Sequence, residues 1–153
     1  MKEKSALNLA EFLPYQLSIT SNAVSGVIAR EYQARFGLKI PEWRVMTLLA
    51  ERGVMSQREL VAGTRMDKVT VNRAVKALVE RGLVGRLPVL KDGRSHGLEL
   101  NAAGEALYGE IVPAALAMDA RLSGVLSADE RRQLSAMLRR MREAADAISG
   151  DCG

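Results

Sequence analysis

The side chains with the most specific chemistry lie in one short stretch of the sequence. They are hydrogen-bonding or cationic, with one small apolar group among them: Lys68, Val69, Thr70, Asn72, Arg73 and Lys76. An Asn amide can form two hydrogen bonds to adenine, an Arg guanidinium can form two to guanine, and a Val side chain can contact the methyl group of thymine. Lys ammonium groups neutralise phosphates. These side-chain types suit a surface that contacts DNA.

This stretch is predicted to be the first half of a helix. Asp67 can accept a hydrogen bond from an unpaired amide of the first turn, and Gly82 can adopt the left-handed conformation that ends a helix. Val71, Val75 and Leu78 fall on one face at helical spacing and form a stripe suited to a core. The polar and cationic residues therefore point outward, as required of a helix that enters a DNA major groove end-first.

Two interpretations of the cationic residues remain open. In the first, Asn72 and Arg73 read bases, while Lys68 and Thr70 reach bases or phosphates. In the second, the cations only neutralise phosphates, which is where most protein–DNA hydrogen bonds go. For Lys76 the second interpretation is favoured.

A shorter helix is predicted directly before this one. Ser56 and Glu59 match a capping box, and the helix that follows should end at Gly63. Two short helices joined by a few residues that include Gly form a helix-turn-helix. Ser56 and Arg65, at the two ends of the shorter helix, are therefore added to the predicted DNA contacts.

A β-hairpin is predicted to follow. Residues 83–90 are rich in β-formers, Asp92-Gly93 is a turn signal, and residues 96–100 alternate between polar and apolar. Pro88 limits the pairing of its strand and suits an edge. A hairpin with a cationic tip after a recognition helix is a wing, from which an Arg can enter the minor groove. The predicted DNA contacts of the tip are Lys91, Asp92 and Arg94, with Asp92 as either a turn residue or a partner that holds a wing Arg.

Helices are predicted on both sides of this core. A long helix over 13–36 should end at Gly37, and a second should begin at Pro41 and run to Gly53. Asn101 can cap a further helix, which Pro113 should interrupt with a kink. A second capping box starts a last helix with an apolar stripe, formed by Leu134, Met137, Leu138 and Met141.

The flanking helices are long for so small a core, and their apolar stripes need a partner, which a second copy of the chain would supply. The sequence therefore predicts a mainly α protein with a small β-hairpin wing, as one domain over 1–153. A winged helix-turn-helix core at 38–100 would lie between dimerisation helices at 10–37 and 101–148.

Charge and composition agree with this prediction. The 153 residues carry a formal net charge of +4; residues 56–96 hold nine Lys or Arg against four Asp or Glu, which is +5 and leaves −1 elsewhere. A basic central segment in a chain whose other parts are nearly neutral is typical of a nucleic-acid-binding module. With no apolar run of membrane-spanning length and no signal peptide, a cytoplasmic protein is expected, without contact to a membrane. The single Cys152 can form no internal disulfide.

Two rival classes of function are open. An enzyme is disfavoured because the sequence has no Gly-rich phosphate loop, no Gly-x-Ser-x-Gly motif, no metal-ligand cluster and only one histidine, His96. No cofactor and no metal are expected. The second rival is a protein-binding adaptor that keeps a winged helix without using DNA. Steep salt dependence of binding to mixed DNA would distinguish the two.

Several local sequences resemble the MarR family of bacterial transcriptional regulators. The most specific are Leu83-Val84-Gly85-Arg86, Asp92-Gly93-Arg94 and Leu98-Glu99-Leu100-Asn101-Ala102-Ala103-Gly104. They are similar to the family's wing pattern of Leu-Val-x-Arg, Asp-x-Arg and Leu-x-Leu-Thr-x-x-Gly. Gly93 stands where the family often has Arg, and Asn101 stands where it usually has Thr.

The resemblance implies a homodimeric regulator, in most cases a repressor, that binds a palindromic operator on double-stranded DNA and releases it when a small aromatic or anionic effector binds. Redox sensing through the only thiol, Cys152, is disfavoured. A guess at the effector pocket, from helix position and chemistry, names Tyr15, Ser18, Asn22, Trp43 and Met46. For Trp43 a core anchor is the favoured alternative, and for Ser18 and Asn22 a solvated or closely packed helix surface.

Overall fold

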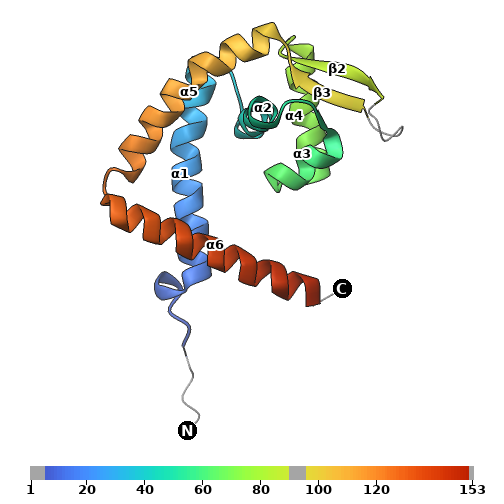
Figure 1. Ribbon diagram of the computed structural model, residues 1–153. Coiled ribbons are helices and arrows are strands. Elements are labelled where there is room, and N and C mark those ends of the chain that lie inside the picture. Colours follow the sequence, from blue (N-terminus) through green and yellow to red (C-terminus); the bar gives the residue numbers. More distant parts are fainter. Residues whose placement is uncertain (1–5, 90–95, 152–153) are drawn as a thin grey trace. The chain divides into compact units, whose positions relative to one another are not determined.

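The computed structural model describes residues 6–89 and 96–151. Its elements are, in chain order, a short 3-10 turn η1 (Leu9–Glu11), α1 (Leu13–Phe36), α2 (Ile40–Arg52), β1 (Met55–Ser56), α3 (Gln57–Thr64), α4 (Lys68–Glu80), β2 (Val84–Val89), β3 (His96–Leu100), α5 (Ala102–Ser123) and α6 (Ala128–Asp151) (Figure 1). They fall into two compact units, residues 1–113 and 114–153. The mainly α fold with a small antiparallel sheet is as predicted.

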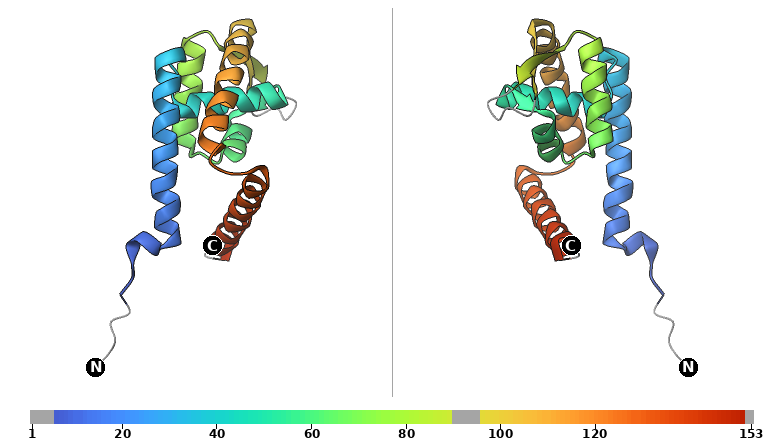
Figure 2. Two further views of the ribbon diagram at one scale, coloured as in Figure 1. Left: turned by 90° about the vertical axis from the view of Figure 1, so that its left-hand side faces the viewer. Right: turned by 90° about the vertical axis from the view of Figure 1, so that its right-hand side faces the viewer.

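The first unit is built around α2, α3, α4 and the sheet. The predicted inner stripe of α4 is confirmed, because Val71, Val75 and Leu78 are at most 1% exposed. They pack in one core with Leu60 of α3 and Leu98 of β3. The N-terminal half of α1 extends away from this core (Figure 2). The core therefore holds the inner face of α4 in place and leaves its outer face to solvent.

The sheet has three strands in the order β1-β3-β2, all antiparallel. The hairpin β2–β3 is as predicted, and β2 is an edge strand whose register is irregular between Leu87 and Val89, at Pro88. Strand β1 was not predicted. It consists of Met55 and Ser56 alone, and two residues are too short to show the alternation that marks a strand in a sequence.

The helix boundaries are close to those predicted. Gly37, with φ of 63°, ends α1, and α2 ends at Gly53. The predicted end of α3 at Gly63 is wrong: the helix continues to Thr64, and the left-handed residue after it is Arg65, with φ of 58°. Gly63 has a packing role instead, because a Cβ at this position would lie 2.7 Å from Cδ1 of Leu48 on α2.

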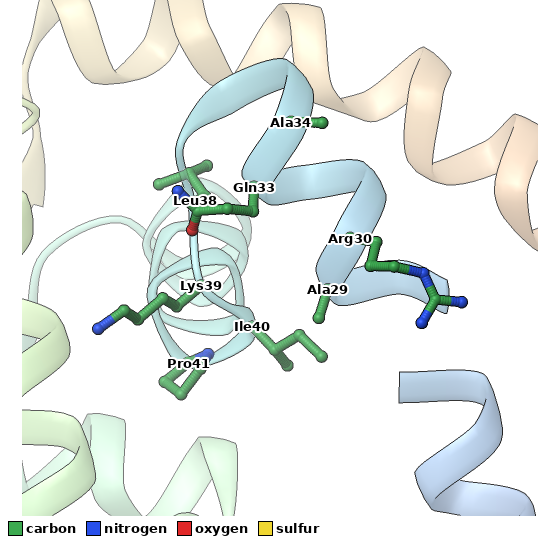
Figure 3. A pocket seen from close by; sticks show the side chains of 8 residues that line it. All are labelled: Ala29, Arg30, Gln33, Ala34, Leu38, Lys39, Ile40 and Pro41. Atoms are coloured by element: carbon green, nitrogen blue, oxygen red, sulfur yellow. The ribbon is translucent and has the colours of Figure 1, made fainter. Parts of the chain in front are cut away.

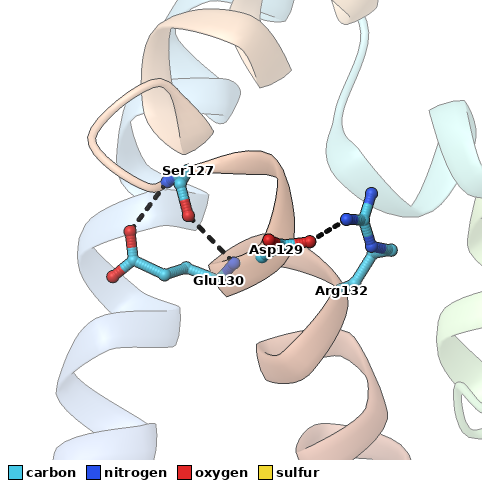
Figure 4. Close-up of polar contacts among 4 residues, drawn as sticks. All are labelled: Ser127, Asp129, Glu130 and Arg132. Carbon is cyan, nitrogen blue, oxygen red and sulfur yellow. Dashed lines mark hydrogen bonds and ion pairs between the residues drawn. The ribbon is translucent and has the colours of Figure 1, made fainter.

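The starts of the last two helices carry the predicted caps. Asn101 Oδ1 accepts a hydrogen bond from Gly104 N at 2.9 Å at the start of α5, and α5 continues from Ala102 to Ser123 with Pro113 inside it, so Pro113 does not break the helix. Before α6, Ser127 N donates to Glu130 and Glu130 N donates to Ser127, which is a complete capping box (Figure 4). Asp129 and Arg132 pair on the first turn.

No single helix within residues 6–89 and 96–151 is long and apolar enough to cross a membrane; α5 and α6 meet that criterion only when they are counted together across the break between them.

Candidate nucleic-acid interface

The outer face of α4 carries most of the predicted contact residues. Val69 is 57% exposed, and Lys68, Asn72, Arg73 and Lys76 are also exposed. Since α4 is held by the core along its opposite stripe, these side chains share one rigid, solvent-facing surface. The structure thus brings together on one helix face an amide, a guanidinium, two ammonium groups and an exposed apolar side chain.

The start of α4 is fixed by a bidentate cap. One carboxylate oxygen of Asp67 accepts from Thr70 N at 2.8 Å and the other accepts from the Thr70 hydroxyl at 2.7 Å. The hydrogen bond from Thr70 N lowers the pKa of the Asp67 carboxyl, and the one from the hydroxyl lowers it further. Because its hydroxyl donates to Asp67, Thr70 can contact DNA only through its oxygen as an acceptor or through its methyl group.

Replacing Asp67 with Ala should lower the thermal midpoint of the protein at pH 7 by a few degrees, since α4 loses its N-cap. A depressed folded-state pKa means that the cap stabilises the fold above the ordinary pKa of Asp, and that this stabilisation is lost as pH falls through the folded-state value. Melting curves should therefore converge for wild type and variant in acid. Asp67→Asn keeps a capping oxygen and should melt close to wild type at pH 7; an Ala variant that melts like wild type at pH 7 would contradict the role.

The end of α4 is held from two sides. The Arg81 guanidinium donates from Nη1 to Gly37 O and from Nη2 to Phe36 O, both at 3.1 Å, and these are the last carbonyls of α1 and its C-cap. Asn101 Nδ2 donates to Gly82 O at 2.7 Å. Helix α4 is therefore tied at its C-terminal end to the end of α1 and to the start of α5.

A hollow of about 490 Å³ separates the outer surfaces of α3 and α4. Its lining residues are Gln57, Arg58, Val61, Lys68 and Asn72. Gln57 and Arg58 were not predicted as contacts, although the first helix of a helix-turn-helix crosses the DNA backbone and they occupy its first turn. The sequence signal that could have identified them is their position directly after the capping residue Ser56, which places them in the first turn of α3.

The two predicted contacts at the ends of α3 differ in their surroundings. Ser56 is 4% exposed and its hydroxyl accepts from Glu59 N at 3.1 Å, so this side chain caps α3 and we leave it out of the proposed interface. Arg65 is exposed and its backbone caps the other end of α3. Of the wing, Arg86 on β2 and His96 on β3 are exposed, whereas Lys91, Asp92 and Arg94 lie outside the described residues.

The five residues predicted for the effector pocket lie in different surroundings. Met46 is fully buried in the core, and Trp43 packs edge-on against Tyr32 at 5.3 Å and stacks on Tyr108 at 5.9 Å between ring centroids. Trp43 is thus the core anchor that was the favoured alternative. Ser18 and Asn22 are exposed on α1, which agrees with the solvated surface favoured for them, and Tyr15 is half-buried.

A hollow of about 680 Å³ lies elsewhere, where α1 ends and α2 begins (Figure 3). Its lining residues are Ala29, Arg30, Gln33, Ala34, Leu38, Lys39, Ile40 and Pro41. None of the five predicted residues is among them, and the walls of this hollow are mainly apolar. Among the described side chains, no three His, Cys, Asp or Glu are grouped so that they could hold a metal ion.

Comparisons with known proteins agree with this geometry. A family model described as "MarR family" matches residues 36–95. The transcriptional repressor NicR of Pseudomonas putida is 34% identical over 93 residues, which are 61% of this chain and 59% of NicR, so the match spans less than two thirds of that relative.

Solved structures match over a greater length. A MarR/EmrR family regulator from Acinetobacter superposes with a TM-score of 0.85 at 23% identity, covering 92% of this chain and 99% of the other. BpsR of Bordetella bronchiseptica, whose DNA binding is regulated by 6-hydroxynicotinic acid, superposes with a TM-score of 0.83 at 23% identity, covering 90% and 97%. At 23% identity, these two matches show the fold of the chain and nothing further.

Proposed function

The chain belongs to the MarR family of winged helix-turn-helix transcriptional regulators, and from this premise we propose that it is a repressor that binds a specific DNA sequence. Regulators of this family are not enzymes. The observation that carries the proposal is the outer face of α4, where Val69, Asn72 and Arg73 stand exposed on a helix whose inner face is fully buried. We place the protein in the cytoplasm, where bacterial DNA is accessible to it.

The residues divide into two roles. Asn72 and Arg73 read base edges, and Val69 contacts a thymine methyl. The remaining proposed contacts bind phosphates or support those that do, and they come from α3, α4 and the wing: Arg58, Arg65, Lys68, Thr70, Lys76, Lys91, Asp92 and Arg94. This division follows from side-chain chemistry, because amide and guanidinium groups can pair bidentately with a base, whereas an ammonium is a point charge.

The active form is a homodimer on a palindromic operator. Support comes from α6, none of whose residues is buried within one chain and whose apolar stripe includes Leu134 at 41%, Met137 at 50% and Met141 at 36% exposed. A contiguous exposed apolar stripe is typical of an association surface. A two-fold dimer would present two copies of α4 to successive turns of DNA, and its operator would then be a palindrome.

A small aromatic or anionic effector releases the DNA. The hollow between the end of α1 and the start of α2 is the site we favour, because its volume of about 680 Å³ and its apolar walls fit a small aromatic ring. Arg30 stands at one side of it and is available to a carboxylate (Figure 3). Release by such a compound would be similar to the regulation of BpsR by 6-hydroxynicotinic acid.

Binding of the wild-type protein to a mixed-sequence duplex should weaken about a thousandfold or more between 50 and 200 mM salt. That is the loss expected when six or more phosphates are neutralised, three from each protomer. Fluorescence anisotropy over a salt series measures the slope, and selection of bound genomic fragments then gives the operator.

The alternative function, a winged-helix adaptor that binds protein and not DNA, predicts the opposite result. In that case the affinity for mixed DNA would be low and nearly independent of salt, and selection would recover no common sequence. Sedimentation of the free protein tests the dimer separately, and a screen of aromatic acids for release of the selected fragment tests the effector.

A further inference from the structure

A second hollow borders α4 on the side away from α3. It has a volume of about 240 Å³ and lies between the start of α2 and the middle of α4. Its lining residues are Lys39, Pro41, Glu42, Thr70, Arg73, Ala74 and Ala77. Lys39, which precedes α2 and lies far from the recognition helix in the sequence, thus shares a surface depression with two residues of the DNA-facing half of α4.

The charges around this hollow favour an anion. Lys39 and Arg73 are exposed cations from two different elements. The one lining carboxylate, that of Glu42, is 8% exposed and accepts a hydrogen bond from Lys39 N at 2.8 Å, so it is engaged with the backbone. The positive end of the α2 macrodipole lies at the same wall, since Pro41 and Glu42 form its first turn.

The direction of the Lys39 side chain separates it from the larger hollow that it also borders. In Figure 3 the Lys39 ammonium and the Arg30 guanidinium point to opposite sides, away from each other. The two cations therefore do not converge on one ligand between α1 and α2. Lys39 is available to the α2–α4 hollow, and Arg30 is not among its lining residues.

We propose that the α2–α4 hollow binds one phosphate of the DNA backbone, with Lys39 as its principal cation. This proposal rests on the proposed function, because it requires α4 to lie in a major groove. A strand that borders the groove then passes along the flank of α4, and most hydrogen bonds between proteins and DNA go to its phosphates and sugars. Lys39 thereby fixes how α4 lies on the DNA and carries no sequence preference of its own.

The test compares three single variants by fluorescence anisotropy on the selected operator and on mixed DNA, over a salt series. Lys39→Ala should weaken binding to both duplexes equally, by about threefold to tenfold at 100 mM salt, and should reduce the magnitude of the salt slope by about 0.9 for each protomer in contact. Lys39→Gln keeps most of the side-chain stem and should show the same loss, which guards against a folding defect in the Ala variant. Arg44→Ala removes an equal charge from an exposed position of α2 that does not line this hollow, and it should leave the slope unchanged.

The outcomes separate this proposal from the function on which it rests. If wild type binds DNA with a steep salt slope and both Lys39 variants share that slope, the phosphate site is overturned and the proposed function stands. If the Lys39 variants lose affinity for the operator but not for mixed DNA, Lys39 reads sequence and the phosphate site is again overturned. If wild type itself shows no salt-dependent binding, the proposed function fails, and the wild-type curve alone shows it.

Discussion

Replacing Gly104 with Ala is expected to cost about 3 kcal/mol of the free energy of unfolding and to lower the thermal midpoint by roughly 10 °C. A Cβ at this position would lie 2.1 Å from the carbonyl oxygen of Leu83 and 3.1 Å from Cδ2 of Leu100. The first of these atoms belongs to the backbone, and Asn101 N already donates to it at 3.1 Å, so it cannot move without breaking that hydrogen bond. Thermal and urea unfolding followed by circular dichroism measure the effect.

Gly109→Ala is the matched control, since Gly109 lies in the same helix and a Cβ there would meet no atom within 4 Å. Ala is a better helix former than Gly by up to about 1 kcal/mol, so this variant should melt at or above the wild-type temperature. Equal destabilisation by both substitutions would mean that α5 tolerates no Ala at a Gly position for some general reason, and the close approach of Gly104 to Leu83 would then not be the cause.

The start of α5 illustrates how much of the fold could be predicted from the sequence. The motif that ends in Asn101-Ala102-Ala103-Gly104 was identified from its residue types, and the structure shows the physical role of each end. Asn101 joins the start of α5 to the end of α4, and Gly104 permits the backbones to meet. Signals of this kind are local. Caps, turn residues and apolar periodicity act over a few residues, and they predicted the helices, the hairpin and the buried stripe of α4.

The features that were missed depend on residues far apart in the chain. Strand β1 exists because Met55 and Ser56 pair with Leu98 and Gly97, some forty residues later. No role was predicted for Lys39, because it is far from Arg73 in the sequence. Only the packing of α2 on α4 places both residues around one hollow. The burial of Met46 could not be predicted for a related reason: chemistry and helical spacing do not reveal which face of α2 the core occupies.

Replacing Arg73 with Ala is expected to cost about 1–3 kcal/mol of binding free energy on the best operator and to flatten the preference at one base pair of each half-site. A guanidinium that pairs bidentately with guanine loses its base contact when that base is changed, so on an operator with that base pair replaced Arg73→Ala should be weaker than wild type only by the loss of one charge. Competition binding with a set of single-base operator variants measures this directly. The affinity for mixed DNA should fall only by what the loss of one charge explains.

Lys76→Ala provides the contrast, because the same helix face presents Lys76 as a phosphate contact. Its loss should weaken every duplex by a similar factor and reduce the magnitude of the salt slope by about 0.9 for each protomer. Arg73 borders both the outer face of α4 and the α2–α4 hollow, so the two roles compete for one side chain. If Arg73→Ala behaves like Lys76→Ala, with a uniform loss across sequences, Arg73 is a second cation of the phosphate site, and base recognition by this face rests on Asn72 and Val69.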